Sequence, residues 1–159
     1  MDDATKRKVL QRFTYGLYAL TVKREGEEHG ITVNWVSQAS FDPPMIVAAV
    51  ESTSRTIELI RDAHHFAINV LHEGQRETAE KLGGAAGGGH RLKGIKTKPA
   101  PASGAPLLVD ALGWLECRVV ATLPAGDHAL VLGEIVEAAM EHEGTGPLTM
   151  SGAGLTYSR

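Results

Sequence analysis

Apolar and polar residues alternate along much of this chain with the period of two that is typical of β-strands. The clearest runs are "YGLYALTVKR" at 15–24, "HFAINVLH" at 65–72, "ALGWLECRVVATL" at 111–123 and "HALVLGEIVEAAM" at 128–140. The motif "PAGD" joins the last two runs and predicts a hairpin turn. A continuous apolar run, "MIVAAVE" at 45–51, predicts a further strand that is buried on both faces.

The stretch "GITVNWVSQASFDPPM" at 30–45 departs from a simple strand pattern. Its first half alternates in the usual way, with apolar Ile31 and Val33 on either side of Thr32. Small hydrogen-bonding side chains then accumulate, and the Asp-Pro-Pro sequence at 42–44 ends the strand. So many polar groups on one strand suggest that they face a pocket rather than open water.

Three segments have the pattern of short helices. They are Asp3–Arg12, "STSRTIELIRDA" at 52–63 and "GQRETAEKLGG" at 74–84. The glycine-rich sequence at 83–90 predicts a mobile loop, and "KTKPAPASGAP" at 96–106 predicts an extended irregular segment. Many strands at short spacing with few helices predict a mainly β protein, a closed antiparallel Greek-key barrel with a few short helices. We expect one domain over residues 1–159, because no repeat or second domain is visible.

Composition and charge narrow the function classes. The chain has 159 residues and a formal net charge of -3, which disfavours a nucleic-acid partner because phosphate binding needs clustered positive charge. No apolar run approaches the roughly 18 residues that span a bilayer, and the first residues lack a secretory signal's apolar core. We therefore expect no membrane partner. The one cysteine, Cys117, lies on the apolar face of a strand, which predicts an inert buried thiol and a cytoplasmic protein.

Several well-known motifs are missing. The sequence has no dinucleotide-binding glycine fingerprint, no P-loop, no zinc-binding H-E-x-x-H and no recognisable Ser/His/Asp order. Its seven histidines do not pair at helical spacing, so we expect no metal site. One segment, "ESTSRT" at 51–56, has two explanations. Either a serine simply caps the following helix, or the helix N-terminus with Arg55 binds a phosphate.

Taken in order, four stretches of the chain resemble the flavin reductase-like, FMN-binding split-barrel family. They are "FTYGLYALTV", "HGITVNWVSQASFDPPMIVAAVE", "SRTIELIRDAHHFAINVL" and "GAPLLVDALGWLECRVVATLPAGDHALVLGEIVEA". The resemblance extends from Phe13 to Val136, and it looks closest to flavoredoxin-type members and to the reductase modules of diflavin proteins. It implies an FMN-binding split barrel.

The resemblance also implies the site residues. One strand would lie along the isoalloxazine ring and ribityl chain through Thr32, Asn34, Trp35, Val36, Gln38 and Ser40. The ribityl phosphate would be bound by Ser52, Ser54, Arg55 and Thr56, where the sequence independently allows an anion. His128, in the "GDH" signature, and Tyr157 in the tail would lie near the nicotinamide nucleotide. We expect no single catalytic residue, because the cofactors carry the chemistry.

The resemblance implies an oxidoreductase that uses NADH or NADPH to reduce bound or exchangeable FMN, with FAD as an alternative flavin. Electrons would pass to a monooxygenase or another acceptor, and the family suggests a homodimer with the flavin site near the subunit contact. Two alternatives stay open. An FMN-binding electron-transfer protein would not be reduced directly by NAD(P)H, which Trp35 would favour if it covers the ring. A flavin-free barrel would have no cofactor affinity.

Overall fold

The computed structural model describes residues 1–84 and 91–156. None of the helices in this described part is long and apolar enough to cross a membrane. The helices are α1 (Asp3–Leu10), α2 (Arg55–Ala63) and α3 (Arg76–Gly83). The strands are β1 (Tyr18–Arg24), β2 (Glu27–Val33), β3 (Val36–Phe41), β4 (Pro44–Glu51), β5 (His65–Val70), β6 (Thr97–Pro99), β7 (Pro106–Leu108), β8 (Gly113–Ala125) and β9 (His128–Met140).

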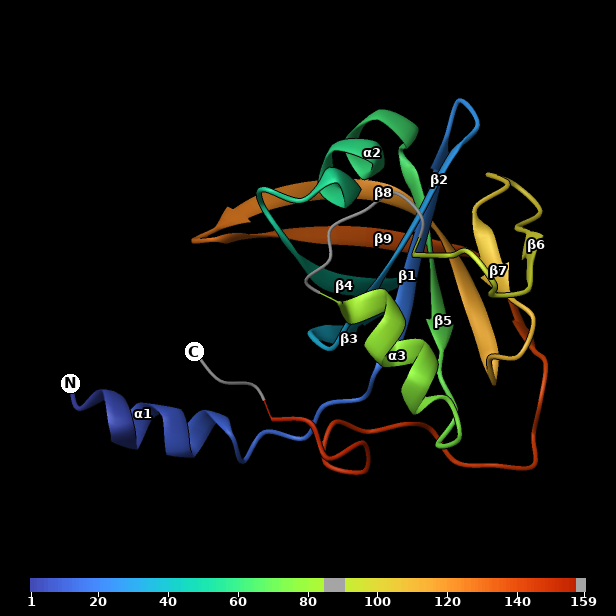
Figure 1. Ribbon diagram of the computed structural model, residues 1–159. Coiled ribbons are helices and arrows are strands. Elements are labelled where there is room, and N and C mark those ends of the chain that lie inside the picture. Colours follow the sequence, from blue (N-terminus) through green and yellow to red (C-terminus); the bar gives the residue numbers. More distant parts are fainter. Residues whose placement is uncertain (85–90, 157–159) are drawn as a thin grey trace.

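Seven strands form one antiparallel sheet in the order β2-β1-β5-β8-β9-β4-β3. Strands β2 and β3 lie at opposite edges of this sheet, although only Asn34 and Trp35 separate them in the chain. The sheet therefore has to curl until its edges meet at this corner (Figure 1). The backbone N–H of Ala49 donates to the carbonyl of Trp35 at 2.9 Å and ties the corner to β4. Within the described residues no ladder pairs β2 with β3, so the barrel is split there.

The main core lies between the curled sheet and α2 (Figure 1). Ile57 and Ile60 of α2 are fully buried against Leu20 of β1 and Phe66 of β5. The helix begins where the sequence predicts, because the Ser54 hydroxyl accepts the N–H of Ile57 at 3.3 Å. The expectation of a mainly β split barrel with a few short helices is confirmed.

Three local expectations need correction. Burial alternates along β4, so this strand is buried on one face rather than on both. The segment expected to be irregular contains a two-stranded sheet, in which Lys98 of β6 pairs with Leu107 of β7. The single strand expected through residues 31–40 is broken at Asn34 and Trp35, because the chain turns there from one sheet edge to the other. Most of the glycine-rich loop, residues 85–90, lies outside the described residues.

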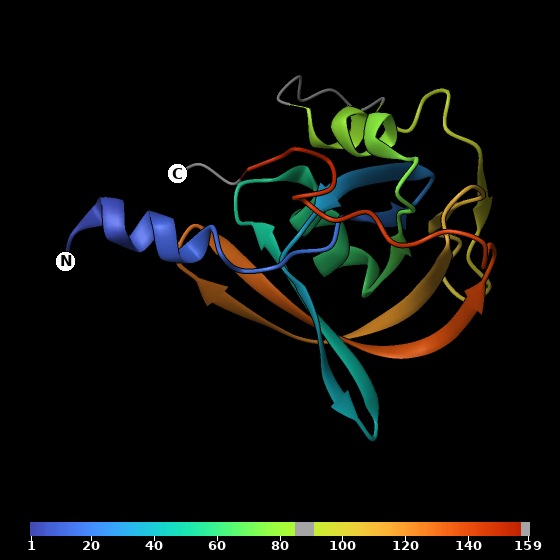
Figure 2. The same cartoon turned by 90° about the horizontal axis from the view of Figure 1, so that it is seen from below.

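Several apolar side chains remain exposed at the periphery. All 8 residues of α1 are exposed, and this helix stands away from the sheet in both views (Figures 1 and 2). Phe41 at the end of β3 is 88% exposed, and Leu123 near the tip of the β8–β9 hairpin is 61% exposed. Figure 2 shows the β3–β4 hairpin and the β8–β9 hairpin extending beyond the body of the barrel.

Candidate functional site

A pocket of ≈ 910 Å³ lies where β2, the corner at Asn34 and Trp35, the end of β4 and the start of α2 come together. His128 of β9, the end of α3 and Arg91 complete its wall. The pocket has a polar end at α2 and an aromatic end at the corner, with apolar residues such as Ile31 and Val50 between them. One cavity thus offers both kinds of surface that a flat ring with a charged tail requires.

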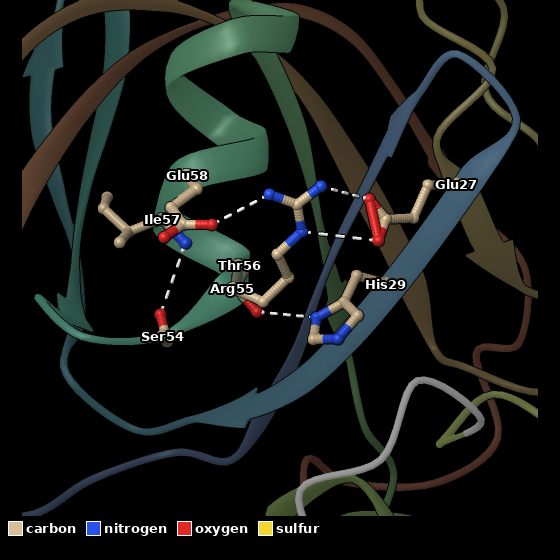
Figure 3. A network of polar contacts seen from close by, with 7 residues as sticks. All are labelled: Glu27, His29, Ser54, Arg55, Thr56, Ile57 and Glu58. Carbon is tan, nitrogen blue, oxygen red and sulfur yellow. Dashed lines mark hydrogen bonds and ion pairs between the residues drawn. The ribbon is translucent and has the colours of Figure 1, made fainter.

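The polar end is built on the first turn of α2. Nδ1 of His29 lies 2.8 Å from Oγ1 of Thr56, and Thr56 is fully buried (Figure 3). The first N–H groups of a helix have no partner within the helix, and the helix dipole makes this end partly positive. Because the Ser54 hydroxyl accepts only the N–H of Ile57, other amide groups of the first turn remain available to an anion.

His29 is held mainly in its neutral form. Burial lowers the pKa of its imidazole, the positive charge of Arg91 lowers it further, and Arg55 acts in the same direction. Glu27 opposes these effects without outweighing them. A neutral imidazole near the helix N-terminus can donate a hydrogen bond to an anion, and a bound anion would favour its protonated form.

Arg55 lines this end of the pocket with a half-exposed side chain and is held by two carboxylates (Figure 3). Its Nε donates to Glu27 Oε1 at 3.3 Å and its Nη2 to Glu27 Oε2 at 2.7 Å, while Nη1 donates to Glu58 Oε2 at 2.8 Å. Hydrogen bonding with Glu27 and then with Glu58 raises the pKa of the guanidinium above its usual value. The same contact with Arg55 lowers the pKa of Glu27, so this carboxyl is ionised at neutral pH.

The aromatic end is formed by Trp35 and His128. Their ring centroids are 4.7 Å apart and the ring planes are tilted by 52°. His128 is largely buried, and its Nδ1 lies 2.6 Å from Oδ1 of Asp127, the residue before it in the β8–β9 turn. Gly126 has a φ of 67° in the same turn, a backbone conformation that favours glycine. The turn thereby sets the position at which His128 enters the pocket.

The wall between the two ends is tied to distant parts of the chain. The Thr32 hydroxyl donates to the carbonyl of Ala79 in α3 at 2.6 Å. The amide of Asn34 donates to Sδ of Met150 at 2.9 Å, and Met150 belongs to the segment that follows β9. These contacts fix β2 and the corner against α3 and the C-terminal segment.

The structure brings seven of the residues implied by the family resemblance to this pocket: Thr32, Asn34, Trp35, Ser54, Arg55, Thr56 and His128. Among the described residues, the pocket wall does not include Val36, Gln38, Ser40 or Ser52. The first three follow the corner on β3, where the chain has already turned to the other sheet edge. Tyr157 lies outside the described residues.

The pocket wall also includes Glu27, His29 and Arg91, which neither the sequence motifs nor the family resemblance indicates. A signal for the first two was present, because Glu27, His29 and Ile31 are two residues apart and therefore share a face of the strand. The polar sequence "EGEEHG" at 25–30 has the composition of a hairpin turn, but β2 already begins at Glu27 within it. Arg91 follows the glycine-rich segment and had no periodic signal.

Comparison with solved structures supports the fold. The NADH:FAD oxidoreductase of Streptomyces globisporus C-1027, solved in complex with NAD and FAD fragments, superposes with a TM-score of 0.86 at 26% sequence identity. The match covers 99% of this chain and 93% of that one. The fold therefore extends over nearly the full length of both proteins.

Sequence comparison gives the same result. The reductase component of 4-nitrophenol 4-monooxygenase/4-nitrocatechol 2-monooxygenase from Rhodococcus opacus is 32% identical over 138 residues, covering 87% of this chain and 72% of that protein. Diflavin flavoprotein A 1 of Synechocystis sp. (strain ATCC 27184 / PCC 6803 / Kazusa) is 33% identical over 135 residues, which are 84% of this chain but only 23% of that longer protein. The family model "Flavin reductase like domain" matches residues 10–158, a range that includes every element of the pocket wall, and the chain belongs to this family.

Proposed function

We propose that this protein is an NAD(P)H-dependent flavin reductase that binds FMN. The observation that carries the proposal is one pocket that has a polar end at the first turn of α2 and an aromatic end at Trp35 and His128. Its volume of ≈ 910 Å³ lies within the range of about 300–1,000 Å³ that is typical of cofactor sites.

The residues of the pocket fit FMN in order along its length. The phosphate would bind the first turn of α2 through Ser54, Arg55 and Thr56, with Ser52 nearby in the chain. Thr32 and Asn34 offer polar groups to the ribityl chain and the ring edge. The further flavin contacts expected on β3, at Val36, Gln38 and Ser40, remain predictions. An FAD ligand would require room beyond the phosphate end.

The chemistry of hydride transfer between a reduced nicotinamide and a flavin belongs to the cofactors. The task of this chain is to hold the flavin, to exclude water from its ring and to admit the nicotinamide ring beside it. His128 and Trp35 border the end of the pocket where we place the nicotinamide nucleotide, with Tyr157 as a further expected contact. No side chain is required as an acid or a base.

One observation favours a second function, that of an FMN-binding electron carrier. Trp35 packs against His128 at the aromatic end, where its indole would cover part of a bound flavin ring. If the ring is covered in this way, electrons would arrive from a protein donor instead of NADH or NADPH. The two functions differ in whether the nicotinamide reduces the flavin directly.

The absorption spectrum of the purified protein, recorded before and after anaerobic addition of NADH or NADPH, tests the proposal. Flavin bands that bleach within seconds are the expected result, and the faster nucleotide is the preferred donor. Bands that persist with both nucleotides would contradict a reductase and support the electron carrier. Absence of flavin bands even after FMN has been added would contradict both.

We also propose a homodimer, with a monooxygenase or a related enzyme as the acceptor of the reduced flavin. Phe41, Leu123 and the apolar residues of α1 are exposed on projecting elements, where a second copy could cover them. We propose a monooxygenase as the acceptor because the similar protein from Rhodococcus opacus is the reductase component of a monooxygenase. Sedimentation velocity at micromolar concentration tests the dimer, and a species of 16.9 kDa would contradict it.

A cytoplasmic location remains our expectation. Burial raises the pKa of the Cys117 thiol to about 12, and the negative charge of Glu116 adds to the effect. The thiol therefore stays protonated and shielded, in keeping with a reducing compartment.

A further inference from the structure

Arg55 is not an open receptor for an anion in this structure. A guanidinium has five N–H donors, and in Arg55 three nitrogen atoms already donate to carboxylates. The contact with Glu27 uses Nε and Nη2 together, the same two-point geometry by which arginine binds a phosphate. Glu27 thus occupies the edge of Arg55 that a phosphate would use.

The local charge also opposes an incoming phosphate. Glu27 and Glu58 contribute two negative charges and Arg55 one positive charge, which leaves a net charge of -1 at this contact. Of the two carboxylates, only Glu27 lines the pocket. A phosphate monoester carries a charge of about -1.5 to -2 at pH 7. If it bound to Arg55, the neighbouring carboxylate of Glu27 would repel it.

The ion pair is nevertheless weak enough to be displaced. The side chains of Arg55 and Glu27 are 50% and 45% exposed, so water screens their attraction. An exposed pair of this kind contributes little to folding, and the helix amide groups attract the phosphate independently. Replacement of Glu27 by a phosphate at Arg55 is therefore feasible, at some loss of affinity.

We propose that Glu27 competes with the phosphate of the flavin for Arg55 and thereby keeps the flavin exchangeable. This inference rests on the proposed function. It gives Glu27 a definite effect, which is to weaken FMN binding. If Glu27 instead served to orient Arg55 toward the phosphate, it would strengthen FMN binding, so the two roles predict opposite results.

The test compares FMN affinity in Glu27→Gln and wild-type protein by equilibrium dialysis, with riboflavin as the ligand that lacks a phosphate. Glutamine keeps the shape of the side chain but removes the charge. We expect FMN to bind about fivefold more tightly, as for loss of one exposed charge interaction, and riboflavin to bind unchanged. Comparison of Arg55→Ala with and without Glu27→Gln measures the direct repulsion between Glu27 and the phosphate, because no guanidinium is left for which the two could compete.

Glu28→Gln is the matched control. Glu28 is the next residue of β2, and its replacement by glutamine removes the same charge. It forms an ion pair with Lys23 at 3.6 Å, and neither residue lines the pocket. Its FMN affinity should equal that of the wild type. Thermal unfolding of each variant, measured without ligand, would show whether the fold is retained.

Three results would overturn the inference. FMN affinity could fall or stay unchanged in Glu27→Gln, it could rise equally in Glu28→Gln, or riboflavin could gain as much as FMN. Each of these results requires that the protein binds a flavin, and so leaves the proposed function intact. If no variant and no wild-type protein binds any flavin, the proposed function itself is overturned and the inference with it.

Discussion

Nδ1 of His29 lies 2.8 Å from Oγ1 of Thr56, and this contact joins β2 to the first turn of α2 at the polar end of the pocket. It places an imidazole beside the helix amide groups that we propose as the phosphate site. Burial and the nearby arginines lower the pKa of His29, so the ring is mainly neutral at pH 7. A bound phosphate would act in the opposite direction and favour the imidazolium.

The titration of His29 should therefore depend on the ligand. In the free protein we expect its NMR titration midpoint below 6.5, the usual value for histidine. FMN should move the midpoint upward, while riboflavin should leave it near its starting value because riboflavin has no phosphate. An unchanged midpoint with saturating FMN would contradict a phosphate near His29.

Replacement of Arg55 by alanine should weaken FMN binding by about tenfold, because a charge-assisted contact is lost and Glu27 is left without its cation. Riboflavin affinity should change little. Hydride transfer in the flavin-bound fraction, measured by stopped-flow absorbance, should also change little. Arg61→Ala is the control, since Arg61 is exposed on the last turn of the same helix. Slower hydride transfer with normal FMN affinity would contradict the assignment.

Replacement of His128 by alanine should raise the KM for the nicotinamide nucleotide by about five- to tenfold, as for loss of one aromatic contact. The affinity for FMN should stay near the wild-type value, because the phosphate end is formed by other elements. Steady-state kinetics and a flavin titration measure the two quantities separately. A parallel loss in both would indicate that His128 supports the fold of the pocket instead.

Glu116 should make stability depend on pH. Its buried carboxylate accepts the N–H of Ala102 at 2.9 Å, the N–H of Ser103 at 2.8 Å and the Ser103 hydroxyl at 2.7 Å. Burial alone would raise the pKa of Glu116, but these hydrogen bonds together lower it below 4.5. Because the folded pKa is the lower one, the stabilisation is present above pH 4.5 and is lost as pH falls through the folded value.

Urea unfolding at pH 7 and at pH 3.5 measures this contribution. Glu116→Gln should lower the free energy of unfolding at pH 7 by about 1–3 kcal/mol, the usual result of weakening buried hydrogen bonds. Between pH 7 and pH 3.5, the free energy of unfolding of Glu116→Gln should fall by less than that of the wild type. Glu143→Gln, at an exposed position, should follow the wild type at both values. A steeper acid dependence in Glu116→Gln would contradict this account.

Local features of the fold could be predicted from the sequence. The start of α2 follows from Ser54, whose hydroxyl caps the first turn within four residues of chain. The long strands β8 and β9 follow from their alternating pattern, with Cys117 fully buried as predicted. In each case the determining interaction lies within one element or on one face of it.

The remaining features depend on contacts between distant residues. The chain breaks at Asn34 and Trp35 because β3 has to pair with β4 at the far edge of the sheet, and local sequence does not contain that pairing. The pattern after the corner was therefore interpreted as a continuation of β2. The roles of His29 and Glu27 at the pocket depend on their contacts with α2. Their partners, Thr56 and Arg55, lie 27 and 28 residues further along the chain.

The split between β2 and β3 has a consequence for how the site is assembled. The two strands are neighbours in the chain, but the hydrogen-bonded path from one to the other passes through every other strand of the large sheet. Small changes in twist between strands add up along this path and appear as a change in the distance across the corner at Asn34 and Trp35. The pocket wall draws on both sides of this corner, so its shape depends on the pairing of the whole sheet. A ligand bound there spans the opening and should raise the melting temperature of the entire barrel, not only of the segments that it contacts.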